Sequence, residues 1–165
     1  MRVAWGRSVA ITTYEEWLAS VPQELASDPL WRMEVYRLAV LAGDLAWHDI
    51  SKLAGDRRMI GLADQLYRAV GSIGANIAEG YSRQSGKDQA RFYEYALGSA
   101  REARGWYYQG RHILPEAVII HRMQSLTGII RLLLTIIPAE RGYKLAEEQT
   151  PYRIDTDLLG TLPMP

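Results

Sequence analysis

Four long segments of this chain repeat apolar residues at alternating intervals of four and three, and this spacing limits the fold more than any other feature. In an α-helix such positions fall on one face, so each segment predicts an amphipathic helix. The segments cover residues 29–53, 58–82, 87–113 and 115–137. No segment alternates apolar and polar residues for long enough to predict a strand. Long helices joined by short turns predict an all-α fold, an antiparallel up-down-up-down four-helix bundle.

The apolar stripes also name the side chains expected in the core. The stripe of 58–82 comprises Met59, Ala63, Leu66, Val70, Ile73, Ile77 and Tyr81. The stripe of 87–113 comprises Phe92, Ala96, Ser99, Ala103, Trp106, Gly110 and Ile113. The helix over 115–137 is apolar on more than one face, which is more than an outer bundle helix needs and indicates a subunit interface.

Start and stop signals divide the chain into three parts. Thr13, followed by acidic residues, predicts a short helix within an N-terminal extension, residues 1–28. Asp28 and Pro29 form a cap and a first helical residue, so the bundle is expected over 29–138, with Pro138 ending its last helix. Residues 139–165 are expected to form an extended C-terminal tail.

Charge and composition restrict the classes of function. The chain has 19 basic and 19 acidic residues and no cysteine. A balanced charge means that nucleic acid or lipid would have to bind at a local patch, and the absence of thiols excludes disulfides and thiolate metal sites. The most apolar run, 132–137, is far shorter than the roughly 20 residues that span a bilayer. We expect a cytoplasmic protein that does not bind membranes.

Residues 69–83 combine an apolar stripe with a second face of small residues. That face comprises Gly71, Gly74, Ala75 and Ala78. Glycine in a helix costs roughly 0.5–1 kcal/mol relative to alanine, so we expect close packing to offset the cost. The bulky partners expected there are Phe92 and Trp106. Leucine at Gly71 or Ala75 should then overpack the contact, at a cost of about 1–3 kcal/mol.

Known catalytic and metal-binding patterns are missing. Residues 80–88 resemble a phosphate-binding loop, but the glycines are one residue too far apart, Asp88 replaces the Ser or Thr, and the stretch joins two helices. A di-iron bundle needs Glu-x-x-His pairs, which none of the histidines completes. The histidines are His48, His112 and His121, of which the last two could meet at the turn between the third and fourth helices. We expect no catalytic residue, no metal and no cofactor.

Basic residues gather at the two ends of the expected bundle. One end receives Arg57, Arg58, Arg111 and His112, and the other receives Arg83, Lys87, Arg91, Arg141 and Lys144. Such patches can hold phosphates, with an affinity that falls with salt, although a charged helix end is more often simply solvated. Asn76, Glu79 and Arg83 share one helical side, where Glu79 and Arg83 form an i,i+4 pair that fixes the turn or contributes to binding.

The stretch Ser-Ile-Gly-Ala-Asn-Ile-Ala-Glu-Gly at 72–80 and the later Ala-Leu-Gly-Ser-x-x-Glu at 96–102 resemble the four helix bundle protein family. That family includes the 23S rRNA intervening-sequence proteins and the accessory variability determinant (Avd) of diversity-generating retroelements. The resemblance covers 29–137 and departs at Gly74, where the family commonly has proline. The signature residues are Gly71, Ser72, Gly74, Asn76, Glu79 and Gly80. The resemblance implies a ring, typically a homopentamer, and the Avd branch binds a reverse transcriptase and nucleic acid.

These observations together predict a non-enzymatic homo-oligomeric scaffold that binds RNA, DNA or a nucleic-acid enzyme such as a reverse transcriptase. The candidate binding residues are Arg57, Arg58, Arg83, Lys87, Arg91 and Arg111. One alternative is a partner-specific regulatory subunit that binds no nucleic acid. Another is an enzyme, or a bundle that binds a small ligand, cofactor or metal, through Asn76, Glu79, His112 or Tyr107.

Overall fold

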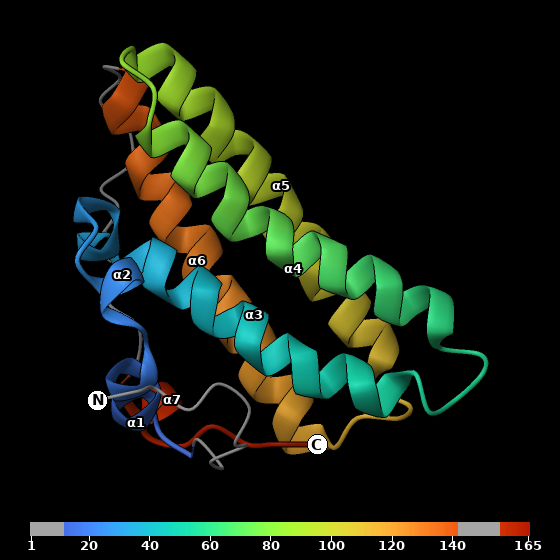
Figure 1. Cartoon of the computed structure of the whole chain (residues 1–165). Helices are drawn as coiled ribbons and strands as arrows, with labels where there is room; N and C mark the ends of the chain where they lie inside the picture. The colour runs from blue at the N-terminus through green and yellow to red at the C-terminus, as the bar shows by residue number, and fades with distance from the viewer. Residues whose placement is uncertain (1–11, 142–155) are drawn as a thin grey trace.

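The computed structural model describes residues 12–141 and 156–165, and all regular structure in these two ranges is helical. Four long helices form an antiparallel bundle, with short helices at both ends of the chain (Figure 1). The long helices are α3 (Glu34–Leu53), α4 (Ile60–Tyr81), α5 (Gly86–Gly110) and α6 (Glu116–Arg141). The short ones are α1 (Tyr14–Ser20), α2 (Gln23–Ala26), the 3-10 turn η1 (Pro29–Arg32) and α7 (Thr156–Gly160). The predicted fold class is confirmed.

The bundle core is continuous, and it is closed most tightly between consecutive helices. Helix α4 packs along α5, α5 packs along α6, and α3 packs along α4, whereas α3 and α6 make a shorter contact. Fully buried side chains from all four helices fill the centre. They include Leu53, Leu66, Val70, Ile73, Ile77, Ala100, Ile129 and Leu133. The weaker contact between α3 and α6 leaves a groove between these two helices that the chain ends cover.

The first long helix begins later than the sequence predicts. Pro29 starts a 3-10 turn, and Met33, in an extended conformation (φ −73°, ψ 115°), separates that turn from α3. The Asp28 carboxylate accepts a hydrogen bond from the backbone N–H of Leu30 at 2.8 Å, so the predicted cap is present. The Arg37 guanidinium donates to the carbonyl of Trp31 at 2.6 Å and holds the turn against α3.

The last bundle helix continues past the residue expected to end it. Pro138 lies inside α6, which runs to Arg141. Proline removes one helical hydrogen bond, and the ion pair of Arg141 with Glu94 of α5, at 2.5 Å, ties the final turn to its neighbour. The expected extended tail is also partly wrong, because α7 is helical. Lys144 lies outside the described residues.

Helix α6 is long and apolar enough to cross a membrane by length and composition alone. Half of its most apolar window, 50%, is nevertheless buried inside the bundle, and the core helix of a soluble protein passes the same test. The core position of α6 accounts for much of the apolar surface that the sequence analysis assigned to a subunit interface. Ile120, at 48% exposure, is an exception.

The buried face of α5 lies one residue away from the predicted stripe at both of its large aromatic positions. Tyr93 and Tyr107 are 3% and 2% exposed, whereas Phe92 and Trp106 are half-buried. A similar shift occurs on α4, where Gly80 is buried and Tyr81 is 40% exposed. A hydrogen bond explains why Tyr107 is buried and its neighbour Trp106 is not, because the Tyr107 hydroxyl donates to Asp49 inside the core at 2.7 Å.

The expected close contact at Gly71 and Ala75 is wrong within this chain. Both residues are exposed, and a Cβ atom at Gly71 would meet nothing within 4 Å. A Cβ at Gly74 would lie 3.8 Å from Ala39, an ordinary contact. The close approach occurs at Gly80, where a Cβ would lie 2.7 Å from the ring of Tyr93. Helix α4 therefore makes its close approach to α5 at Gly80, nearer its C-terminal end than predicted.

The two chain ends meet over the groove between α3 and α6. Leu162 is 2% exposed and packs in a second small core with Trp17 of α1 and with Leu41 and Leu45 of α3. The backbone N–H of Leu162 donates to the carbonyl of Thr12 at 2.8 Å. Figure 1 shows α1 and α7 together on this side of the bundle.

Candidate functional sites: a buried ion pair and two cationic ends

A charged network occupies the centre of the bundle. Asp49 of α3 is 0% exposed and Arg122 of α6 is 2% exposed. The Arg122 guanidinium donates twice to this carboxylate, from Nε at 2.8 Å and from Nη2 at 3.2 Å. The Tyr107 hydroxyl adds a third hydrogen bond to Asp49. Burial first, then the Asp49 charge, raises the pKa of Tyr107 well above its usual value, so the phenol stays neutral and donates.

Arg122 also connects the core to the C-terminal segment. Its Nη1 donates to Nδ1 of His121 at 3.0 Å, and its Nη2 donates to the carbonyl of Pro163 at 2.8 Å. The Leu158 carbonyl can only accept, so His121 donates from Nε2, at 2.9 Å, and accepts at Nδ1. Burial first, and then the Arg122 charge, lowers the pKa of His121 to about 4. The imidazole is therefore neutral at pH 7.

The depressed pKa of His121 predicts acid sensitivity. An unfolded chain takes up this proton below about pH 6.5, whereas the folded chain takes it up only near pH 4. This difference in proton uptake leaves the free energy of unfolding unchanged above pH 6.5. It lowers the free energy of unfolding as the pH falls from 6.5 to 4. Urea unfolding measured across this range should show a steeper loss for the native chain than for His121→Gln. Parallel profiles would contradict the assignment.

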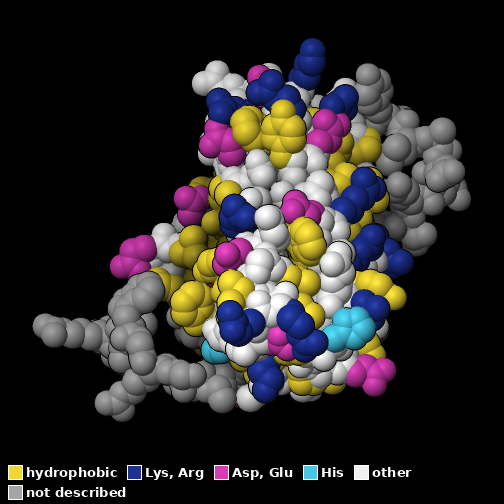
Figure 2. Space-filling view, turned by 90° about the vertical axis from the view of Figure 1, so that its right-hand side faces the viewer, with side chains coloured by type: hydrophobic (Ala, Val, Ile, Leu, Met, Phe, Trp, Pro, Cys, Tyr) yellow, Lys and Arg dark blue, Asp and Glu magenta, His cyan; other side chains and the backbone are white. Residues whose placement is uncertain are grey.

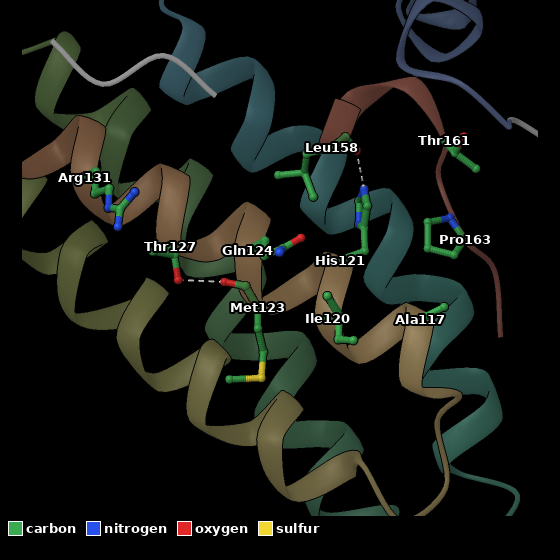
Figure 3. Close-up of a pocket in the computed structure, with 10 residues that line it drawn as sticks. All are labelled: Ala117, Ile120, His121, Met123, Gln124, Thr127, Arg131, Leu158, Thr161 and Pro163. Atoms are coloured by element: carbon green, nitrogen blue, oxygen red, sulfur yellow. Dashed lines mark hydrogen bonds between the residues drawn. The ribbon is translucent and has the colours of Figure 1, made fainter. Parts of the chain in front are cut away.

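A surface cavity of about 870 Å³ lies between α6 and the C-terminal segment, next to His121. Ile120 and Gln124 line its α6 side, and Thr161 and Pro163 lie opposite (Figure 3). Thr127 in the same wall donates to the Met123 carbonyl at 2.7 Å. This cavity is mostly apolar and is open to solvent. This cavity was not predicted from the sequence, because one of its walls, with Leu158, Thr161 and Pro163, belongs to the C-terminal tail.

The turn between α3 and α4 and the end of α5 form one cationic groove. Arg58, Arg111 and His112 line a cavity of about 650 Å³ together with the ring of Trp106. Arg111 Cζ lies 4.0 Å from the ring centroid of Tyr108, and Tyr108 is 53% exposed. Arg58 forms a 2.5 Å ion pair with Asp56, and the hydrogen bonds from Arg58 lower the pKa of Asp56 to about 2. The predicted grouping of these basic residues is therefore present in the structure.

The opposite end is cationic as well, but acidic side chains accompany its arginines. Arg83 pairs with Glu79, and Arg91 lies 3.8 Å from Asp88. Both guanidinium groups also lie over the ring of Phe92, at 4.8 Å and 5.5 Å from its centroid. Figure 2 shows Lys and Arg side chains at both ends of one face, with acidic side chains among them. Lys87 is exposed at this end, as Arg57 is at the other.

The signature residues of α4 mostly make local contacts. Asn76 donates from its side chain to the Ser72 carbonyl at 2.8 Å, one turn back in the same helix. Glu79 faces solvent and pairs with Arg83, as the spacing predicts. Gly80 packs on Tyr93. In this chain the signature therefore combines a packing position with an exposed polar side.

The histidines do not meet. His112 lines the cationic groove, and His121 belongs to the buried network. Across residues 12–141 and 156–165, no group of three or more His, Asp or Glu side chains is placed to hold a metal ion. The buried network was missed by the sequence analysis, although Asp49 and Arg122 were visible as charges inside apolar helices. Their pairing across 73 residues leaves no local signal.

The fold and these sites define an all-helical bundle with cationic ends and a buried ion pair whose charged groups are hydrogen-bonded. A family model for the 23S rRNA-intervening sequence protein matches residues 32–134. The chain belongs to the 23S rRNA-intervening sequence protein family, whose members are generally non-catalytic. Comparisons with curated proteins and with solved structures give no match. The matched range contains α3, α4, α5 and most of α6, and it excludes α1 and α7.

Proposed function

We propose that this protein is a non-enzymatic, homo-oligomeric scaffold that binds single-stranded nucleic acid at the end formed by the α3–α4 turn and the end of α5. The observation that carries the proposal is the groove in which Arg58, Arg111 and His112 line one cavity beside Trp106. Guanidinium groups bind phosphate, and aromatic rings stack on unpaired bases. The cavity offers guanidinium groups beside the half-buried ring of Trp106, and the exposed ring of Tyr108 lies against Arg111.

The balance of charge favours this end over the other. Within the described residues, Asp56 is the one acidic ion-pair partner of Arg57, Arg58 and Arg111, and 80% of the Arg58 side chain and 23% of the Asp56 side chain are accessible. Exposed ion pairs contribute little, so Arg58 can exchange Asp56 for a phosphate at small cost. At the α4–α5 end, Arg83 and Arg91 each have an acidic partner and share the ring of Phe92. That arrangement favours a role in holding the turn.

Self-association is the second part of the proposal, and the pentameric ring is the form that resemblance to the family suggests. Several large apolar side chains are exposed on the single chain, and two of them, Trp47 and Tyr67, lie in ring contact at the surface. The exposed side chains include Trp47, Ile60, Tyr67, Tyr95, Tyr108 and Ile120. A ring would repeat the cationic groove around one axis and raise the avidity for a long strand. The resemblance to the family also suggests a reverse transcriptase as protein partner, and the compartment proposed is the cytoplasm.

The binding site predicts a difference between two triple variants of equal charge change. Replacing Arg57, Arg58 and Arg111 by glutamine should weaken binding to a fluorescein-labelled single-stranded RNA by at least about tenfold at 50 mM salt, since each contact releases counterions. The control replaces Arg83, Lys87 and Arg91 by glutamine and should change the affinity by less than about threefold. Fluorescence anisotropy measures both.

Equal losses in the two triple variants would mean that only net charge matters and would contradict the site. Loss in the control alone would move the site to the α4–α5 end. Light scattering on the same samples tests the oligomer, because a mass of 18.7 kDa at micromolar concentration would contradict self-association.

A partner-specific regulatory subunit that binds no nucleic acid is the second candidate. It is favoured by the formal net charge of +0 and by the exposed pair of Trp47 and Tyr67, whose ring centroids lie 6.0 Å apart. Such a pair suits a protein interface, where aromatic residues are enriched. The same anisotropy titration decides between the two, because this candidate predicts no RNA binding even at low salt.

A further inference from the structure

The C-terminal segment, residues 158–163, is held mainly through its backbone. His121 donates to the Leu158 carbonyl at 2.9 Å, and Arg122 donates to the Pro163 carbonyl at 2.8 Å. The Leu162 N–H donates to the Thr12 carbonyl at 2.8 Å. Every residue has a backbone carbonyl, so these contacts position the last turn of α7 and the residues after it whatever their sequence. Specificity must come from the side chains between them.

Those side chains are leucines that pack against the hydrophobic clusters of the bundle. Leu162 is 2% exposed against Trp17, Leu41 and Leu45. Leu158 and Leu159 pack on the main core, and Leu159 closes a small enclosed pocket between α3 and α6. The groove thus selects a peptide with two adjacent leucines followed by a third leucine three residues later.

The groups that receive this peptide are fixed by the bundle itself. Arg122 is 2% exposed and makes two hydrogen bonds to Asp49, which also accepts from Tyr107. His121 is 4% exposed, and its ring is oriented by Arg122. Such a preorganised receptor loses little entropy when a peptide arrives. The hydrogen bonds that orient Arg122 thus include ones to Asp49 of the bundle, independent of the segment.

The connection to the segment is long compared with the distance it must cover. Arg141 ends α6 about 30 Å from His121, at about 1.5 Å per helical residue. Residues 142–155, which lie outside the described part of the chain, make a connection that can span up to about 45–50 Å when extended. The segment of one chain can therefore reach the groove of a neighbouring copy as well as its own.

We propose that the groove between α3 and α6 is a peptide-binding site that exchanges this segment between copies of the chain, so that the C-terminal segment of a second copy occupies it. The exchanged segment makes the same contacts, as in domain swapping, which is a low-cost route to association. The chain's own segment competes at an effective concentration in the millimolar range. Exchange is thus favoured at high concentration or inside an assembly. This interaction goes beyond the proposed function and does not depend on nucleic acid.

A peptide titration tests whether the groove accepts the segment from outside. The protein is the full-length Leu162→Asp variant, whose C-terminal segment lacks the leucine that is buried in the native chain. The probe is a fluorescein-labelled peptide with the native sequence of 156–165. We expect saturable binding, at least about tenfold tighter than to the native chain, where the tethered segment competes. The control peptide carries Leu162→Asp and should bind at least about tenfold more weakly.

Leu162→Ala serves as a second protein variant if the aspartate prevents folding, which circular dichroism and a thermal melt report. Saturable binding of the native peptide to either folded variant, with weak binding of the control peptide, supports the site. A folded variant that binds neither peptide overturns the proposal, and so does equal binding of both peptides.

Energy transfer between chains tests for the second copy. The chain has no cysteine, so Pro165→Cys carries a donor and, in a separate preparation, Ala117→Cys carries an acceptor in the wall of the neighbouring cavity. Mixing the two should give transfer that grows with concentration and falls at least about twofold when the donor chain also carries Leu162→Asp. Transfer that is absent, or unchanged by Leu162→Asp, overturns exchange between copies.

Discussion

Replacing Asp49 by alanine should lower the free energy of unfolding by about 3–5 kcal/mol, because it leaves the Arg122 charge buried without its partner. The arginine is 2% exposed and gives two hydrogen bonds to this carboxylate. The Tyr107 hydroxyl, also buried, loses its acceptor at the same time. Because a small domain has only about 5–15 kcal/mol of stability, the loss should be visible as a large fall in the midpoint of urea unfolding.

Two comparisons isolate the buried charge. Asp64→Ala, at an exposed position of α4, should change stability by less than about 0.5 kcal/mol. The double variant Asp49→Ala with Arg122→Met removes both charges and should recover part of the loss, since an apolar pair leaves no unpaired charge. A single Asp49→Ala variant as stable as the native chain would mean that the pair is not buried in solution.

Replacing Gly80 by alanine should destabilise the bundle by about 1–3 kcal/mol through overpacking. The added Cβ would lie 2.7 Å and 2.9 Å from two ring atoms of Tyr93 and 3.1 Å from the Cβ of Phe92. Tyr93 is 3% exposed and belongs to the main core, so moving its ring would disturb other core contacts. This opposes the gain of up to about 1 kcal/mol that alanine brings to a helix.

Gly71→Ala is the matched control, because it is the same change in the same helix. A Cβ at Gly71 meets nothing within 4 Å, so alanine should stabilise the isolated chain by about 0.5–1 kcal/mol. Thermal melts of the two variants should move in opposite directions. A stabilising Gly80→Ala would contradict the close approach of α4 and α5, and a destabilising Gly71→Ala would point to a subunit contact at that face.

The sequence predicts the helices and their order well, because the spacing of apolar residues is a local signal. In α4, the stripe from Ala63 to Ile77 is buried as expected. The rotation of α5 could not be predicted in the same way. The choice of Tyr107 over Trp106 depends on Asp49, which lies 58 residues away. The two aromatic residues are adjacent, so periodicity alone does not distinguish them.

Helix ends were predicted less accurately than helix interiors, for a related reason. Pro138 is a local stop signal, but the ion pair between Arg141 and Glu94 joins α6 to α5 beyond it. Leu162 becomes a core residue because α1 and α3 provide a seat for it. Neither contact has a local pattern in the sequence.

The candidate site was predicted in part. The grouping of Arg58, Arg111 and His112 follows from the antiparallel order of the helices, which puts the start of one beside the end of another. From the sequence, both cationic ends were equally good candidates for binding. The difference between them comes from side-chain pairing, such as that of Arg91 with Asp88, and from the exposed ring of Tyr108 beneath Arg111.

The salt dependence of RNA binding tests the central claim most directly. For a single strand, the slope of the logarithm of the binding constant against the logarithm of salt concentration is about −0.7 per phosphate contact. Replacing Arg57, Arg58 and Arg111 by glutamine should therefore reduce its magnitude by about 2, whereas the variant at Arg83, Lys87 and Arg91 should keep the native slope. A slope that is the same in all three proteins, or no binding by the native chain at low salt, would contradict a nucleic-acid site in this groove.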